Sequence, residues 1–291
     1  MNRRAGLRPV TLGERVFGIW LVVISAIFFS TAGVFSKGVA VDAWTIIFWR
    51  GIFAAACGLL YVFVIGRLRD EVRDFKAPSI AVSIVYASGT AAFIPAFKLT
   101  SIANVALIWS TAPVLAGLFA WWLFGQRVSF GFAMACAAVL GGTLVIVYGS
   151  FGGAGLAGDL LALWMTMMMV LIMMIYRRFP DTPSTLPTVA ASILLLPVSL
   201  YFSEPLVAAP GDIGLMALFG ITFVIASITL AQGSKFVSPG ETALISVSES
   251  PWAIILAILF LAEFPTLQTV IGGTIIMAAV LWYQVTALRG S

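Results

Sequence analysis

The sequence predicts an all-α membrane protein in which ten transmembrane helices form two inverted five-helix repeats, with both termini in the cytoplasm. Three observations support this fold class. Of the 291 residues, 61% are hydrophobic and only 10% are charged, whereas a typical soluble domain has about 25% charged residues. The hydrophobic residues gather in ten runs, each close to the ~20 residues that a helix needs to cross a bilayer. The second half of the chain also repeats features of the first.

The apolar runs define the expected helices. None alternates between apolar and polar residues as the strands of a membrane barrel do, so helices are favoured. The run at 187–203 is the shortest and contains Pro197. Residues 1–16 form a polar cytoplasmic segment, and the first run is longer than the apolar part of a signal peptide, so we expect it to be retained. In order, the runs cover residues 17–36, 43–65, 77–97, 102–123, 129–148, 159–176, 187–203, 213–233, 240–261 and 266–287.

The basic residues of the loops predict the orientation, because Lys and Arg are enriched in cytoplasmic loops. With the N-terminus in the cytoplasm, ten crossings place thirteen of the sixteen basic residues on the cytoplasmic side. Only Lys37 and Lys98 fall on the opposite side, and Arg50 lies within a span. If one helix were miscounted, the basic residues would be distributed over both sides of the membrane. Their concentration on one side therefore supports ten crossings.

Two stretches that lie 137 residues apart reveal an internal repeat. Phe97–Ile108 (FKLTSIANVALI) and Ser234–Ile245 (SKFVSPGETALI) share five of twelve residues, and a proline follows in both copies, Pro113 and Pro251. Each copy holds an odd number of helices, so the second is inverted in the membrane relative to the first. Inverted repeats are typical of secondary transporters, whose substrate site lies near the bilayer midplane. The expected copies cover residues 17–148 and 159–288, joined by a linker at 149–158.

Five segments carry a resemblance to a known family. They are Phe48–Phe53 (FWRGIF), Lys98–Pro113 (KLTSIANVALIWSTAP), Trp122–Val128 (WLFGQRV), Gly158–Leu160 (GDL) and Lys235–Glu263 (KFVSPGETALISVSESPWAIILAILFLAE). In these segments the chain resembles the drug/metabolite transporter superfamily, specifically its ten-helix EamA-type branch. The resemblance covers about residues 17–287. It implies export of amino acids or other metabolites or, as in some members, import of cofactors or nucleotide derivatives.

Two positions depart from the family pattern. Gln126 stands where the family commonly has Glu after a glycine, and Ser250 separates Glu249 from Pro251, whereas the family often places Glu directly before this proline. One residue turns a helix by ~100°. A functional role for Glu249 therefore requires a local distortion of its helix.

Glu249 and Arg50 are the two charged residues that lie clearly within predicted spans. Glu249 is expected ~13 Å inside its helix at a rise of 1.5 Å per residue. A carboxylate at this depth must be protonated, paired or hydrated, so Glu249 is a candidate for proton coupling or for binding a substrate amine. The structural alternatives are an ion pair with Arg50 and a protonated acid bonded to a neighbouring helix. Arg50 is a candidate for that pair, for snorkelling or for binding a substrate carboxylate.

Pro113 and Pro251 predict kinks in the fourth and ninth helices, because each removes a helical hydrogen bond and frees the carbonyl four residues earlier. In a membrane, such carbonyls need partners or a water-filled cavity. The kinks are therefore candidate hinges beside a shared central site, the alternative being kinks used only for packing.

The resemblance implies that helices one, three, four, six, eight and nine line the central cavity. For any single Ser or Thr, ordinary helix packing is the alternative role. The expected substrate-binding residues are Phe28, Ser30, Tyr86, Thr90, Trp109, Ser110, Trp164, Ser227, Ser246 and Trp252.

The composition excludes several classes of function. The chain has no histidine, so Ser-His hydrolases and His-ligated metal sites are excluded. No Walker A sequence occurs, and no Asp lies mid-span as an intramembrane aspartyl protease requires. We expect no enzymatic activity, no cofactor and no metal. The favoured hypothesis is a secondary transporter that works by alternating access, driven by protons or substrate exchange, with a channel or lipid scramblase as a distant alternative.

The expected partners are a small-molecule substrate and membrane lipid. The net charge of +4 is explained by basic cytoplasmic loops, so a nucleic-acid partner is not expected. We expect a multi-pass protein of the bacterial cytoplasmic membrane, as a monomer or a weak homodimer.

Overall fold

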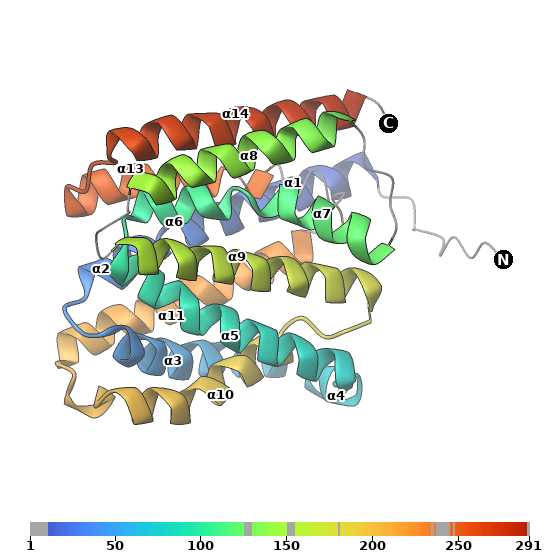
Figure 1. Ribbon diagram of the computed structural model, residues 1–291. Helices are drawn as coiled ribbons and strands as arrows, with labels where there is room; N and C mark the ends of the chain where they lie inside the picture. The colour runs from blue at the N-terminus through green and yellow to red at the C-terminus, as the bar shows by residue number, and fades with distance from the viewer. Residues whose placement is uncertain are drawn as a thin grey trace.

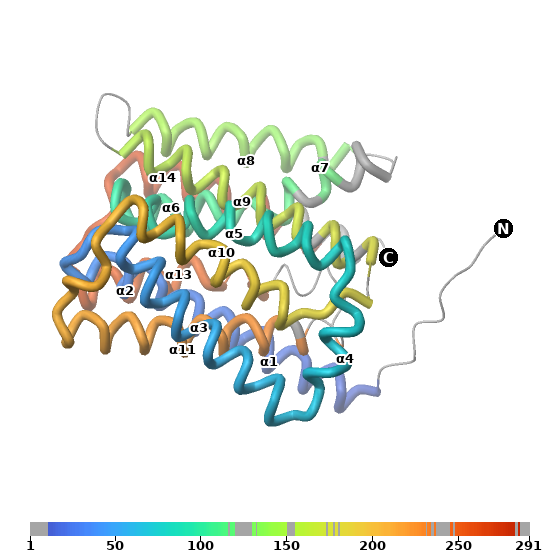
Figure 2. The backbone as a smooth tube through the Cα atoms, turned by 90° about the horizontal axis from the view of Figure 1, so that it is seen from below, coloured from blue at the N-terminus to red at the C-terminus, as the bar shows by residue number. Residues whose placement is uncertain are grey.

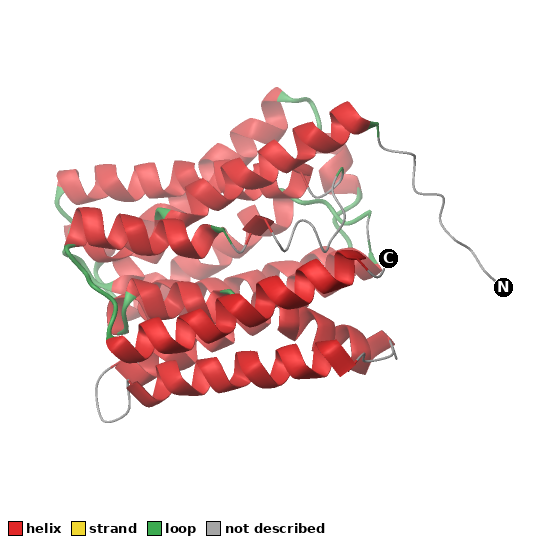
Figure 3. Ribbon diagram, turned by 90° about the horizontal axis from the view of Figure 1, so that it is seen from above, coloured by secondary structure: helices red, strands yellow, loops and turns green. Residues whose placement is uncertain are grey.

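The computed structural model describes residues 11–124, 130–149, 155–179, 181–233, 236, 245–246 and 248–289. Within these ranges the regular structure is helical and no strand occurs (Figure 3). In lipid, a helix satisfies its backbone hydrogen bonds within its own segment. The all-α fold class is therefore confirmed for the part of the chain that the structure describes.

The helices follow the apolar runs. The described helices of the first half are α1 (Leu12–Ser30), α2 (Ala32–Gly38), α3 (Ala43–Val64), α4 (Leu68–Arg73), α5 (Ala77–Leu99), α6 (Ile102–Trp109), α7 (Ala112–Phe124) and α8 (Phe130–Gly149). Those of the second half are α9 (Gly155–Arg178), α10 (Leu186–Phe202), the short 3₁₀ helix η1 (Pro205–Val207), α11 (Pro210–Gly233), α13 (Glu249–Leu261) and α14 (Leu267–Arg289). The short run with Pro197 is thus helical, and α4 is an addition in a segment where no helix was expected.

The lengths of these helices fit a membrane protein. Six helical segments of the described chain are long and apolar enough to cross a bilayer, and four further apolar helices are 10–17 residues long. Together with the low charge content, these helices identify an integral, multi-pass membrane protein.

Polar side chains next to the apolar runs set where helices begin. The Thr11 hydroxyl accepts the Glu14 backbone N–H, while the Glu14 carboxylate accepts the Thr11 N–H, so α1 begins with a complete capping box. One oxygen of Asp42 accepts the backbone N–H groups of Trp44 and Thr45 at 2.8 and 3.0 Å, which caps α3.

Two segments that were expected as single helices are interrupted. The run at 17–36 divides into α1 and α2 at Thr31, whose hydroxyl donates to the Phe28 carbonyl at 2.6 Å. The run at 102–123 divides into α6 and α7 at Ser110–Thr111. Pro113 is the second residue of α7, a position where the N–H that it lacks would have no intrahelical partner.

The run at 240–261 also differs from a single helix. Residues 245–246 are helical, Ser248 lies in a turn, and α13 begins at Glu249. Pro251 therefore lies in the first turn of α13, where proline is tolerated. Residues 240–244 and 247 of this run lie outside the described residues.

The connections between helices alternate between two ends of the bundle (Figure 1). The terminal end, where α1 begins and α14 ends, also carries residues 65–76 and 179–185. The distal end carries residues 39–42, 100–101, 203–209 and 262–266. The described chain therefore begins and ends on the same side.

The major helix contacts join the first half of the chain to the second. Helix α1 packs on α11 and α5 packs on α9, while α3 packs on α10, α6 on α13 and α8 on α14 (Figures 1 and 2). Suppose that α1 corresponds to α9 and α5 to α11. A two-fold rotation then exchanges the pair α1–α11 with the pair α9–α5. It maps each of the pairs α3–α10, α6–α13 and α8–α14 onto itself. This pattern fits the two-repeat architecture.

The crossing of α8 and α14 shows the same symmetry at atomic detail. A Cβ atom built on Gly142 would lie 2.7 Å from the Gly272 carbonyl oxygen and 2.7 Å from Ile276 Cγ1. A Cβ atom on Gly272 would lie 2.5 Å from the Gly142 carbonyl oxygen and 2.7 Å from Ile146 Cγ1. The two backbones are therefore in direct contact, which only glycine allows at both positions.

We expect Gly142→Ala to lower the stability of the protein by about 1–3 kcal/mol, because its methyl group would meet the Gly272 backbone. Gly141→Ala is the matched control, since no atom lies within 4 Å of a Cβ atom at that position. In a helix, this control substitution is expected to be neutral or to stabilise by about 0.5–1 kcal/mol. Thermal unfolding in detergent measures both, and equal effects would contradict the close helix crossing.

Candidate functional site

The two halves of the chain meet where α6 ends and α13 begins. The hydroxyl oxygens of Ser110 and Ser250 are 2.5 Å apart, and both lie within hydrogen-bonding distance of the Ala106 carbonyl oxygen, at 3.0 and 2.7 Å. The two serines are 1% and 0% exposed. We call these three residues the helix junction. At the helix junction, the polar atoms exposed by the break between α6 and α7 find hydrogen-bond partners in the other half of the chain.

Glu249 and Trp109 lie beside the helix junction. The Trp109 side chain lies close to the Glu249 carboxyl group, and both side chains are partly buried. Because the helix is interrupted just before Glu249, this residue is the first of α13 instead of a mid-helix residue. An acidic group in the first turn also interacts favourably with the helix dipole. The local distortion that a role for Glu249 requires is therefore present.

Arg50 points from α3 into an aromatic cluster. Its side chain is 2% exposed, and its guanidinium carbon lies 4.4 Å from the Phe223 ring centre and 5.5 Å from that of Phe219. Tyr86 packs edge-on against Phe223 at 6.1 Å. The expected ion pair between Arg50 and Glu249 is not formed in this structure, because the guanidinium lies over these rings, whereas Glu249 lies beside Trp109.

A second group of polar contacts lies at the distal end of the bundle. We call it the distal clamp, and its members are Lys37, Thr100, Asn104, Asp159, Glu263 and Thr269. Lys37 Nζ lies 2.6 Å from Glu263 Oε2. The other Glu263 oxygen accepts the backbone N–H of Ile102 at 2.6 Å. The helix α2, the start of α6 and the loop after α13 are thereby tied together.

The buried part of the clamp is centred on Asp159, which is 0% exposed at the start of α9. Asp159 accepts the Thr100 hydroxyl at 2.6 Å and the Asn104 amide at 3.0 Å. Thr269 of α14 donates to the Asn104 side-chain oxygen at 2.6 Å. Gly158 permits this contact, because a Cβ atom there would lie 2.7 Å from the Thr100 backbone nitrogen. The network joins the two halves of the chain at the distal end.

Comparison with known families agrees with this two-part construction. The profile of the EamA-like transporter family matches the chain twice, over residues 16–148 and 156–284. The chain belongs to the EamA-like transporter family. The resemblance noted in the sequence is thereby confirmed, and this EamA-like protein is a membrane transporter of small molecules.

Solved structures support the fold of this EamA-like protein. Among them, 28 chains match significantly. One of these, described only as "Crystal structure of protein", is 18% identical with a TM-score of 0.66, and the match covers 95% of this chain and 98% of the other. At this identity the likeness shows the fold alone. The comparison with curated proteins gives no significant match.

The structure brings together part of the predicted substrate-binding set of the EamA-like protein. Trp109 and Ser110 lie at the helix junction next to Glu249. Tyr86 and Ser227 are neighbours beside Arg50. These two groups come from five different helices, α3, α5, α6, α11 and α13.

The other predicted residues are not joined to these groups by a hydrogen bond of the described chain. Ser30 donates to the Ile27 carbonyl of its own helix at 2.7 Å. Trp164 is 47% exposed and donates to the Ser88 hydroxyl at 3.1 Å, and Trp252 is also 47% exposed. Phe28 and Ser246 are partly buried, and Thr90 is buried.

Sequence reasoning gave no role to the members of the distal clamp. Asp159 and Glu263 were within the segments that carry the family resemblance, yet they lie at helix ends, where acidic residues are common. Asn104 and Thr269 come from different halves of the chain. The available signal was the polar character of Asn104 inside an otherwise apolar segment.

We expect Ser110 and Ser250 to stabilise the protein as a coupled pair. A double-mutant cycle of Ser110→Ala and Ser250→Ala is expected to show a coupling free energy of about 1 kcal/mol in thermal unfolding, because each hydroxyl is a partner of the other. Ser248→Ala is the matched control, because the Ser248 hydroxyl bonds only to the nearby Ile245 carbonyl among the contacts of the described chain. Additive effects of Ser110→Ala and Ser250→Ala would contradict the pairing.

Proposed function

We propose that this EamA-like protein is a secondary active transporter that exports a small metabolite, such as an amino acid or a related compound, by alternating access. The supporting observation is the helix junction, where interrupted helices from the two halves of the chain meet. Interrupted helices at the interface of inverted repeats are the usual location of substrate sites in secondary transporters. The driving force in this proposal is a proton gradient or substrate exchange.

We propose ten membrane crossings, in which the four shorter apolar helices cross as well. The terminal end then faces the cytoplasm of a bacterial cell, and the protein lies in the cytoplasmic membrane. The support is the distribution of charge in the loops. The described connections at the terminal end carry Arg67, Arg69, Arg73 and Lys76, whereas Lys37 and Lys98 lie near the distal end.

In this proposal the distal clamp is the closed gate of one transport state. Alternating access requires one half of the molecule to move against the other around the substrate. The clamp contacts join α2, α6, α9, α14 and the loop after α13, so they must separate before substrate leaves at the distal end. The partly exposed Lys37–Glu263 pair, with both side chains 22% exposed, is the first contact that water can reach.

We propose that Glu249 couples transport to protons or binds a substrate amine. Pro113 and Pro251 act as hinges at the breaks beside it. Tyr86, Trp109, Ser110 and Ser227 form the inner substrate contacts. The remaining candidates contribute to the same cavity when the helices rearrange, and they are Phe28, Ser30, Thr90, Trp164, Ser246 and Trp252.

The general test of transport uses the purified protein in liposomes. A thermal-shift screen against metabolite pools identifies ligands, and each is then tested for counterflow. Saturable uptake that rises when unlabelled ligand is present inside supports a transporter. Flux without such trans-stimulation would contradict the proposal and favour a channel or a scramblase. Ligands of cofactor or nucleotide type, moved inward, would instead support an importer.

We expect Glu249→Gln to abolish the pH dependence of transport in proteoliposomes while counterflow persists, because the amide keeps the Trp109 contact but cannot change its protonation. Glu204→Gln is the matched control, since Glu204 is exposed in the distal loop 203–209. The measurement is initial uptake across a pH series for both variants and the original protein. An unchanged pH profile in Glu249→Gln would exclude coupling through this residue.

We expect a cross-link across the distal clamp to stop transport. A Lys37→Cys/Glu263→Cys variant, made after replacing Cys57 and Cys136 by Ala, can be bridged by a short bis-maleimide. Bridging holds the distal end closed, so uptake in liposomes is expected to fall to the level of empty vesicles. Each single-cysteine variant treated with the same reagent is the control. Full transport by the cross-linked protein would contradict the gate.

A further inference from the structure

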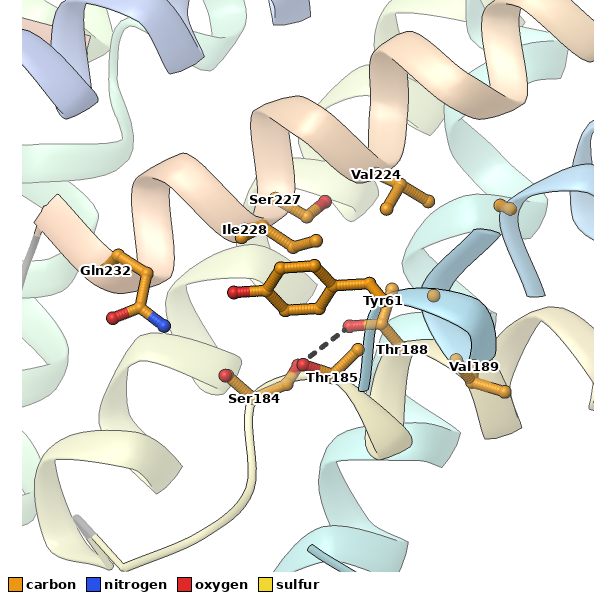
Figure 4. A pocket seen from close by; sticks show the side chains of 11 residues that line it. Tyr61, Ser184, Thr185, Thr188, Val189, Val224, Ser227, Ile228 and Gln232 are labelled. Atoms are coloured by element: carbon orange, nitrogen blue, oxygen red, sulfur yellow. Dashed lines mark hydrogen bonds between the residues drawn. The ribbon is translucent and has the colours of Figure 1, made fainter. Parts of the chain in front are cut away.

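A small pocket lined by apolar and hydroxyl-bearing side chains lies between α3, α10 and α11 (Figure 4). Its cavity volume is ≈ 20 Å³, which is room for about one water molecule. Figure 4 shows the Tyr61 ring lying across the pocket, between Ser227 and Gln232 of α11 and Ser184 and Thr185 before α10. The loop at 179–185 belongs to the terminal end, so the pocket is entered from that end.

The groove that forms this pocket leads toward Arg50. On α3, the lining residues Ala54, Gly58 and Tyr61 follow Arg50 at helical spacing, so all four share one face of the helix. On α11, Val224 and Ser227 line the pocket, and Phe223, next to Val224, lies beneath the guanidinium. Arg50 therefore lies about one helical turn, ~6 Å, beyond the inner end of the pocket.

The Arg50 guanidinium is not fully hydrogen-bonded within the part of the chain that the structure describes. Its Nε and Nη1 atoms are buried and have no hydrogen-bond partner within the described chain. None of the salt bridges within the described ranges involves Arg50; they include Lys37–Glu263 and three contacts near Asp70 and Asp74. The two phenylalanine rings offset only part of the cost of burying a cation. An unpartnered, buried charged donor beside a pocket calls for a ligand.

We propose that Arg50 binds the carboxylate group of the transported substrate and that this substrate carries an apolar or aromatic group next to the carboxylate. This inference rests on the proposed transport function and adds the chemical class of the substrate. The guanidinium presents a planar fork of N–H donors that matches a carboxylate in a two-bond contact. Phe219 and Phe223 contact the apolar part of the ligand, and the hydroxyl groups of the pocket line its route from the terminal end.

The charge balance favours a carboxylate over a phosphate. A buried pair of one cation and one monoanion is neutral, whereas a phosphate brings up to two negative charges to a site with a single described cation. The aromatic rings that flank Arg50 also suit an apolar ligand more than a hydrated inorganic ion. The phosphate of a lipid headgroup could also supply the anion. Nanodiscs with and without phosphatidylglycerol distinguish this source from a soluble carboxylate.

The test measures ligand binding to the full chain purified in a neutral detergent, so it does not depend on transport. The probes are 3-phenylpropanoate and its amide, 3-phenylpropanamide, which has the same shape without the charge. Inorganic phosphate and nanodiscs with and without phosphatidylglycerol are parallel arms. We expect the carboxylate, and not the amide, to raise the unfolding temperature and to show saturable binding by calorimetry.

Arg50→Met is expected to weaken carboxylate binding by about 10- to 100-fold, because a charge-assisted hydrogen-bonded contact is lost. The unfolding temperature of this variant without ligand is expected to be unchanged or higher, since an unpaired buried charge is removed. Arg50→Lys keeps the charge but not the fork, and it is expected to bind the carboxylate about 10-fold more weakly. Arg73→Met, at an exposed side chain on α4, is the control and should bind like the original protein.

Several outcomes would overturn the assignment. These are equal binding of acid and amide, tighter binding of phosphate, stabilisation by phosphatidylglycerol alone, or unchanged carboxylate affinity in Arg50→Lys. Carboxylate binding that depends on Arg50 without any counterflow would support the site and contradict the transport proposal. Counterflow of a neutral substrate without carboxylate binding would support the transport proposal and contradict the Arg50 site.

Discussion

The bilayer favours partners for the polar atoms that a broken helix frees inside it, and the helix junction provides them where α6 ends and α13 begins. A proline in α7 prevents the helix from running on unbroken, and the serine hydroxyls at the break gather on one carbonyl oxygen. Because Ser110 and Ser250 come from opposite halves of the chain, neither half can satisfy this contact alone. The packing of α6 on α13, the position of Glu249 and the contact with Trp109 all depend on it.

The distal clamp applies the same constraint nearer the surface. Asp159 is fully buried, yet it is satisfied by hydroxyl and amide donors and not by a cation. Water can replace neutral donors when the contacts separate. Separating a buried ion pair would instead leave two uncompensated charges, which is energetically costly. The only ion pair of the clamp among the described residues, Lys37–Glu263, is partly exposed. The molecule therefore combines a buried inner junction with a distal end whose contacts suit the opening that we propose.

Composition, loop charges and the repeated segment were sufficient to predict the all-α class and the two-part construction, and the resemblance of five segments indicated the family. These features are visible as local sequence patterns, because a bilayer requires apolar helices and favours basic residues in cytoplasmic loops. Pro113 predicted a kink in the fourth helix, and the structure has a full interruption at Ser110–Thr111. The break at Thr31 has no proline and was not expected. The contacts of Asp159 with Thr100 and Asn104 join residues 59 and 55 positions apart, and no local pattern specifies them. The surroundings of Arg50 were missed for the same reason, since Phe219 and Phe223 lie on a helix of the other half.

The reciprocal contact of Gly142 and Gly272 also bears on how such a chain arises and changes. In a dimer of two identical five-helix chains, a single glycine would supply both sides of the crossing, and one mutation would alter both at once. In the fused chain the two glycines are inherited separately. Each still faces the carbonyl oxygen of the other, so neither half can vary at this position without regard to its counterpart. At this crossing a substitution in one half is tolerated only if it is compatible with the backbone of the other half.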